Sequence, residues 1–105
     1  MEEKLIERGY KRYNANAMDL VCHPFIECFY QKKIEDTTGI KYVIQFYKYP
    51  PVGNVKPQAS WLCEVTLSNP HATFQMHYVT NIVDCEEMVD KLWVMVNGEY
   101  FEKYE

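Results

Sequence analysis

Glycine is scarce in this sequence, and the few glycines present do not form a nucleotide-binding loop. The 105 residues include 4 glycines, none of them in a G-x-G arrangement. A phosphate-cradling loop needs several glycines before a helix, because bare backbone must approach the phosphate groups. The sequence therefore argues against the usual nucleoside triphosphate sites.

Basic residues are also in the minority. There are 11 Lys and Arg against 15 Asp and Glu, which gives a net charge of −4. Domains that bind nucleic acid normally carry a basic stripe that meets the phosphates. The balance argues against nucleic acid as a partner, and the alternative is a small patch made by Lys32, Lys33, Lys41 and Lys48. Binding through that patch would weaken steeply with added salt.

Long apolar runs are absent as well. No stretch approaches the roughly 20 apolar residues that a membrane-spanning helix needs. The opening Glu2-Glu3-Lys4 is charged, so we expect no signal peptide. We therefore expect a soluble cytoplasmic protein without membrane contact, in which the four cysteines are reduced thiols.

The cysteines and histidines lack the spacing of a metal site. No C-x-x-C pair occurs, and the one tight pair, Cys22-His23, is adjacent and awkward for tetrahedral ligation. The same pair is a weak candidate for a nucleophile and its base, because neighbours along a chain generally point apart. We expect no metal, no cofactor and no catalytic residue, so a binding protein is favoured over an enzyme.

What the sequence does contain is the composition of one globular domain. Hydrophobic residues make up 48% and charged residues 25%, which is close to the globular average. We expect residues 1–105 to form a single domain.

Two β-hairpins are the clearest pattern. The runs 25–35 and 40–49 flank Asp36-Thr37-Thr38-Gly39, which suits a three-residue loop with a left-handed glycine. In that register Ile34 lies opposite Tyr42, and Glu35 lies opposite Lys41. The second pair of runs, 60–67 and 72–79, surrounds a four-residue loop.

Opposed residues of the second hairpin alternate cleanly in polarity. Val65 lies opposite Phe74 on an apolar face, and that face continues to a Trp61–Tyr78 pair. Glu64 lies opposite Gln75 on the polar face. Alternation with period two indicates a sheet with one buried face.

Helices are expected at both ends of the chain. The first covers residues 2–8 and ends at Gly9, and the second covers residues 85–96 after Asp84 as N-cap and ends at Asn97-Gly98. Residues 10–24 show no clear element, although Tyr10 to Tyr13 could form a short strand.

These elements predict an α+β fold. It has a four-stranded, mostly antiparallel sheet of two consecutive β-hairpins, with the N- and C-terminal helices packed on one face. The sheet residues expected beneath the helices are Ile34, Ile44, Phe46, Val65, Phe74 and Met76.

The other face of the sheet is the candidate binding surface. It combines aromatic residues with hydrogen-bonding side chains, a mixture suited to contacting a protein or a planar ligand. Its residues are Phe29, Gln45, Tyr47, Tyr49, Leu62, Glu64, Gln75 and His77.

Two hypotheses of function follow from this surface. The first is a non-enzymatic binding or adaptor protein that uses the face for a protein partner or for self-association. The alternative is a small-ligand-binding protein or enzyme with its site between the sheet and residues 10–24. A structural alternative involves no binding: residues 10–24 or the aromatic C-terminal tail cover this face and make it a second small core.

Overall fold

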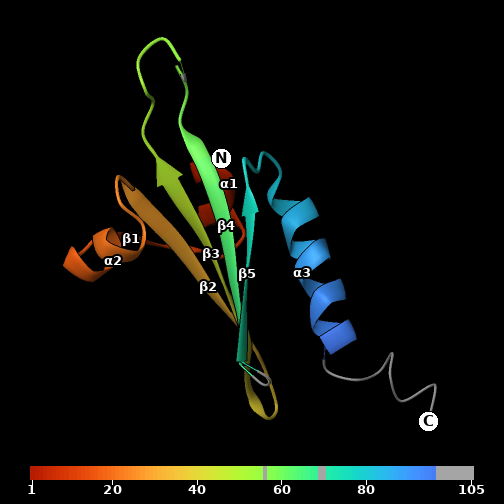
Figure 1. The fold of residues 1–105 in the computed structure, drawn as a ribbon. Helices are drawn as coiled ribbons and strands as arrows, with labels where there is room; N and C mark the ends of the chain where they lie inside the picture. Colours follow the sequence, from red (N-terminus) through yellow and green to blue (C-terminus); the bar gives the residue numbers. More distant parts are fainter. Residues whose placement is uncertain (56, 69–70, 97–105) are drawn as a thin grey trace.

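The chain folds around one antiparallel sheet whose strands follow one another in sequence order, β1-β2-β3-β4-β5 (Figure 1). The computed structural model describes residues 1–55, 57–68 and 71–96. Its elements are α1 Glu2–Glu7, β1 Lys11–Asn14, α2 Ala17–Cys22, β2 Cys28–Asp36, β3 Gly39–Tyr49, β4 Ser60–Ser68, β5 His71–His77 and α3 Ile82–Val96. The predicted α+β class and antiparallel sheet are confirmed, but the predicted count of four strands is wrong because β1 adds a fifth.

Residues 10–24 hold two elements that the sequence did not resolve. Lys11 to Asn14 pair antiparallel with the start of β2, so β1 extends the sheet at one edge. A capping box then begins α2: the Asn16 Oδ1 atom accepts from the Asp19 N–H, and the Asp19 carboxylate accepts from the Asn16 N–H, both at 2.9 Å. This reciprocal pair satisfies two amides that a helix start leaves without partners.

The first hairpin, β2–β3, has the predicted register along most of its length. Ile34 lies opposite Tyr42, as expected, but Glu35 pairs with Ile40 rather than with Lys41. The hydrogen-bonded ladder continues to Asp36 and Gly39, and the extra residue is absorbed as a β-bulge. Asp36 stabilises this tighter turn by accepting from the Thr38 N–H at 2.8 Å.

The second hairpin, β4–β5, has the predicted register from Leu67–Ala72 to Leu62–His77. The predicted Trp61–Tyr78 pair does not form, because β5 ends at His77 and Tyr78 has a φ of 55°. A left-handed residue turns the chain out of the extended conformation. The strand therefore ends where Tyr78 leaves the ladder.

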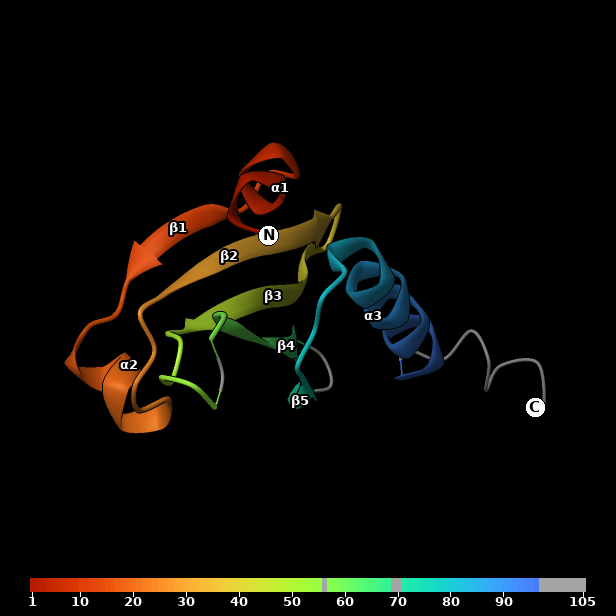
Figure 2. The same ribbon diagram turned by 90° about the horizontal axis from the view of Figure 1, so that it is seen from above.

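The two terminal helices pack on one face of the sheet, as predicted (Figure 2). Leu5 of α1 and Val89 of α3 are fully buried in the same cluster. Of the six sheet residues expected there, Ile44, Phe46 and Val65 are buried and Ile34, Phe74 and Met76 are partly buried against the cluster.

The closing helix begins one turn earlier than predicted. Helix α3 starts at Ile82, and the Asn81 Oδ1 atom accepts from the Asp84 N–H at 3.1 Å. Asn81 is therefore the N-cap, and Asp84 lies in the first turn where its charge favours the helix dipole. The predicted stop at Asn97-Gly98 and the aromatic tail lie outside the described residues.

The opposite face of the sheet carries a second, smaller core. Ile26, Phe29, Tyr47 and Leu62 are buried there, and Tyr13 and Tyr49 pack against them. Helix α2 lies on this side of the sheet, away from α1 and α3 (Figure 2). Residues 10–24 thus cover part of the face that was the candidate binding surface. Within the described residues, no helix is long and apolar enough to span a membrane.

Candidate functional site

His23 fixes the segment after α2 onto the second face of the sheet. Its ring stacks on Tyr47, with centroids 4.0 Å apart and planes at 25°. Its Nε2 atom lies 2.9 Å from Glu64 Oε2, and Gln75 donates to the same carboxylate oxygen at 3.2 Å. These polar residues hold the short α2 in place, because none of that helix's own residues is buried.

This arrangement buries Tyr47 against the sheet. Only 5% of the residue is exposed, and its hydroxyl donates to the Gln45 side chain. Burial, and next the charge of Glu64, raise the pKa of the Tyr47 phenol well above its usual range. Tyr47 therefore stays protonated near neutral pH and serves as a structural contact.

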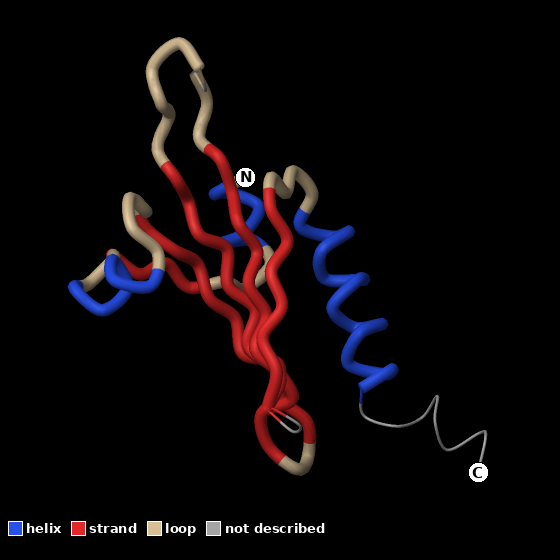
Figure 3. Tube along the Cα trace, in the orientation of Figure 1, coloured by secondary structure: helices blue, strands red, loops and turns tan. Residues whose placement is uncertain are grey.

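A pocket of about 310 Å³ opens where this covering ends. Its lining includes residues at the end of β3, in the β3–β4 loop and at the start of β4. Figure 3 shows this long loop leaving one end of the sheet. The lining residues of the pocket come from the α2–β2 connection, the β3–β4 hairpin and the end of β5: Phe25, Tyr49, Pro50, Val52, Ser60, Trp61, Leu62, His77 and Tyr78. A volume near 300 Å³ is at the lower limit for small-molecule sites and suits one aromatic ring or amino-acid side chain.

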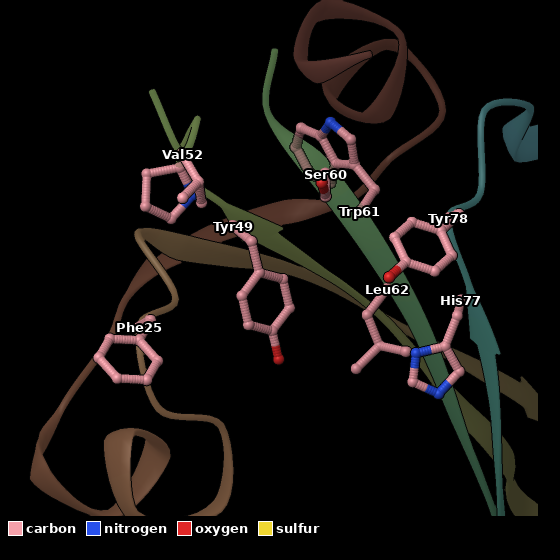
Figure 4. A pocket seen from close by; sticks show the side chains of 9 residues that line it. Phe25, Tyr49, Val52, Ser60, Trp61, Leu62, His77 and Tyr78 are labelled. Atoms are coloured by element: carbon pink, nitrogen blue, oxygen red, sulfur yellow. The ribbon is translucent and has the colours of Figure 1, made fainter. Parts of the chain in front are cut away.

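Two exposed aromatic rings stand on opposite sides of the pocket (Figure 4). Phe25 is 82% exposed and Tyr78 is 69% exposed, and Tyr49 and Leu62 lie between them. Both flanking residues have left-handed backbone, with φ of 75° at Phe25 and 55° at Tyr78. They are the two non-glycine residues with positive φ in the described part of the chain.

This backbone conformation is costly for large side chains. A left-handed residue with a Cβ is disfavoured by roughly 1–2 kcal/mol, and bulky residues rarely adopt it outside turns and functional sites. Neither ring gains much burial in return, since both are mainly exposed. Core packing therefore does not explain why two exposed aromatic residues with strained backbone lie on the two sides of one pocket.

Polar groups occur at the margin of this pocket and are few. The Ser60 hydroxyl, the His77 imidazole and the Tyr49 and Tyr78 hydroxyls can donate or accept hydrogen bonds. Burial, followed by the nearby charge of Glu64, raises the pKa of Tyr49, so that phenol is protonated near neutral pH. The lining suits recognition of an apolar group with a polar tip.

The predicted site residues are divided between three environments. Tyr49, Leu62 and His77 meet at the pocket. Phe29 and Tyr47 lie in the second core, and Leu62 is shared between that core and the pocket. Glu64, Gln75 and Gln45 form the polar contacts around His23 and Tyr47. Phe29, Tyr47 and Leu62 are each at most 8% exposed, so this part of the face is a second small core, as in the structural alternative, and is not open to a partner.

Three of the four cysteines lie in the protein interior. Cys28, Cys63 and Cys85 are buried, and Cys22 is exposed at the end of α2. A hydrogen bond with Cys85, followed by burial, raises the pKa of the Cys63 thiol and keeps it protonated. Among the described residues, no group of three or more His, Cys, Asp and Glu side chains is close enough to hold a metal ion.

The sequence did not indicate the two flanking residues of the pocket. Phe25 and Tyr78 both fall at the ends of runs that alternate like strands, so both were expected to be extended. The Pro24 before Phe25 was the one available sign of irregular backbone at that end. No comparable sign precedes Tyr78.

Comparison with known proteins gives no family to which this chain can be assigned. No family model, no curated protein and no solved structure matches it. The site must therefore be interpreted from its own geometry.

Proposed function

We propose that this chain is a non-enzymatic binding protein that takes an apolar side chain, preferably an aromatic one, from a protein partner into the pocket between Phe25 and Tyr78. The observation that carries the proposal is that two exposed aromatic residues, both with strained left-handed backbone, lie on the two sides of that pocket. Strain of this kind persists where the surrounding structure imposes it, and it gathers at binding sites.

A protein partner fits the surroundings of the pocket. Val52 lines it and is 61% exposed, and Val55 farther along the same loop is 84% exposed. On the other side, α2 exposes Met18 and Val21, at 71% and 75%. Exposed apolar groups near a central pocket are typical of an anchor site with a wider contact area.

Peptide selection on the immobilised protein tests the proposal. We expect the enriched peptides to share one aromatic or large aliphatic residue, with affinity that falls at least about tenfold in Phe25→Ala and Tyr78→Ala. Ile6→Ala is the matched control, because Ile6 is also exposed, at 54%, but does not line the pocket. Peptides that bind all three variants equally, or no enrichment at all, would contradict the proposal.

Binding of a free small molecule is the second candidate, because the pocket volume of about 310 Å³ reaches the lower limit for small-molecule sites. In that case isolated aromatic compounds with a hydroxyl or carboxyl group would bind in the micromolar range without any peptide context. Dissociation constants of about millimolar or weaker would leave the protein-partner proposal as the better account.

A further inference from the structure

The last strand of the sheet has one side without a strand neighbour. β5 pairs with β4, and no other described strand lies on its far side. Such a strand presents a row of backbone N–H and C=O groups that can pair with another extended chain.

Proteins usually protect a sheet edge, and the two edges of this sheet differ in that respect. β1, the opposite edge, has 4 residues and exposes Lys11 and Arg12. β5 has 7 residues, His-Ala-Thr-Phe-Gln-Met-His, with no Lys, Arg, Asp, Glu, Pro or Gly. Short length, charge and proline are the common means of blocking edge pairing, and among its own residues β5 has none of them.

Polar and apolar residues alternate in β5 in the same order whether the strand is read forwards or backwards from Phe74. An antiparallel pairing of two β5 strands about Phe74 would place Ala72 opposite Met76 of the second copy and Thr73 opposite Gln75 of the second copy. Ala72, Phe74 and Met76 all contact the larger core, so apolar residues would meet on that face. Polar residues would meet on the other face, and no like charges would be opposed.

Helix α3 adds an apolar surface beside this edge. It packs over β4, and its Glu86 and Asp90 reach Tyr10 and Tyr42 on the side of β1 to β3. The opposite flank of the helix carries Met88, Leu92 and Met95, with both methionines 51% exposed, and helical spacing places this flank on the β5 side of β4. Figures 1 and 2 show α3 beside this end of the sheet.

We propose that two copies of the chain associate through β5, pairing antiparallel about Phe74 and burying the Met88–Met95 flank of both α3 helices. A stable interface buries roughly 800 Å² on each partner, more than a single short strand provides, and the helix flank supplies additional area. A two-fold arrangement pairs the β5 backbone of both copies in one contact, so neither copy keeps a free β5 edge for a third chain. His77 belongs both to β5 and to the pocket lining, whereas Phe25 and Tyr78 lie outside β5, and Thr73 and Gln75 lie outside the pocket. Variants of these two pairs therefore test the two proposals independently.

Sedimentation or light scattering of the full chain over about 5–200 μM tests this proposal. One copy has a mass of 12.5 kDa, and we expect twice that mass at the upper end of the range. In the T73K/Q75K variant each introduced lysine would lie opposite a lysine of the second copy, and we expect dimer affinity to fall at least about tenfold. In the T73E/Q75K variant opposite charges would meet, and the dimer should be retained.

Both variants change exposed side chains and should keep the fold, which circular dichroism can verify. The lysine introduced by Q75K would also keep a favourable neighbour, because Gln75 already contacts the Glu64 carboxylate in the native chain. A mass of 12.5 kDa at every concentration would overturn the proposal. So would equal dimer strength in the two variants, or protection of the β5 edge within a single copy.

Discussion

Individual residues carry the strongest signs of function in this chain. Phe25 and Tyr78 hold left-handed backbone while their rings remain exposed. An aromatic residue gives no sequence signal for positive φ, in contrast to glycine or asparagine. Gly39 was predicted to be left-handed for that reason, and its φ of 128° agrees.

Replacement of Phe25 tests the strain directly. Asparagine adopts left-handed backbone more easily than alanine does. We therefore expect Phe25→Asn to be more stable than Phe25→Ala by about 0.5–1 kcal/mol, with both variants losing peptide binding. Denaturant unfolding measures the difference, and equal stability of the two variants would mean that the left-handed conformation is not retained.

At the scale of elements, the four strands of the two hairpins were predictable, whereas β1 and the connections between strands were not. Period-two alternation gave both hairpins and most of their register, because the larger core is buried on one face only. The bulge before Asp36 and the early end of β5 depend on local backbone choices that side-chain polarity does not report.

Helix α2 was missed for a different physical reason. It has 6 residues and buries none of them, so it shows no apolar stripe of helical period. Its position depends on the capping box at Asn16 and on His23, whose partners Tyr47 and Glu64 are far away in the sequence. Single-sequence patterns do not reveal contacts of that kind.

His23→Ala should release α2 from the sheet. The change removes the contact with Glu64 and the stacking on Tyr47, and we expect a loss of about 1–2 kcal/mol in the free energy of unfolding. Amide hydrogen exchange in residues 17–22 should become faster. Met18→Ala is the control, because Met18 lies on the same helix and is 71% exposed. Unchanged exchange in His23→Ala would show that α2 is held by other contacts.

Helix α1 should show a dependence on acid pH. The Glu2 carboxylate accepts from Tyr30 Oη at 2.9 Å and from Lys48 Nζ at 3.1 Å. The hydrogen bond from Lys48, followed by that from Tyr30, holds the pKa of Glu2 below its ordinary value of 4.5. A carboxyl group with a lowered pKa in the folded state stabilises that state above its ordinary pKa, and this contribution is lost as the pH falls through the folded value.

We therefore expect the α1 resonances to change as the pH is lowered below about 4.5, with no comparable change between pH 5 and 8. NMR spectra recorded across this range measure the transition. In Glu2→Gln the acid transition of α1 should disappear, since the amide does not titrate. An identical transition in Glu2→Gln would assign it to another carboxyl group.

At the scale of the whole molecule, the sheet has a large core on one face and a small one on the other. The face pattern in the sequence indicated the large core, and it placed Phe29, Tyr47, Tyr49 and Leu62 on the second face, but it did not place Ile26 or Tyr13 there. It left open whether residues 10–24 cover that face and did not indicate the pocket beside the covered part, because both depend on the three-dimensional path of residues 10–24.

Titration of the isotope-labelled protein with 4-methylphenol, which is the tyrosine side chain in isolation, tests the proposed binding site most directly. We predict saturable NMR shifts at Leu62, His77 and Tyr78, with a dissociation constant on the order of millimolar. These shifts should be lost in Phe25→Asn. Saturable shifts centred elsewhere on the molecule, or none at any of the pocket residues, would contradict the account.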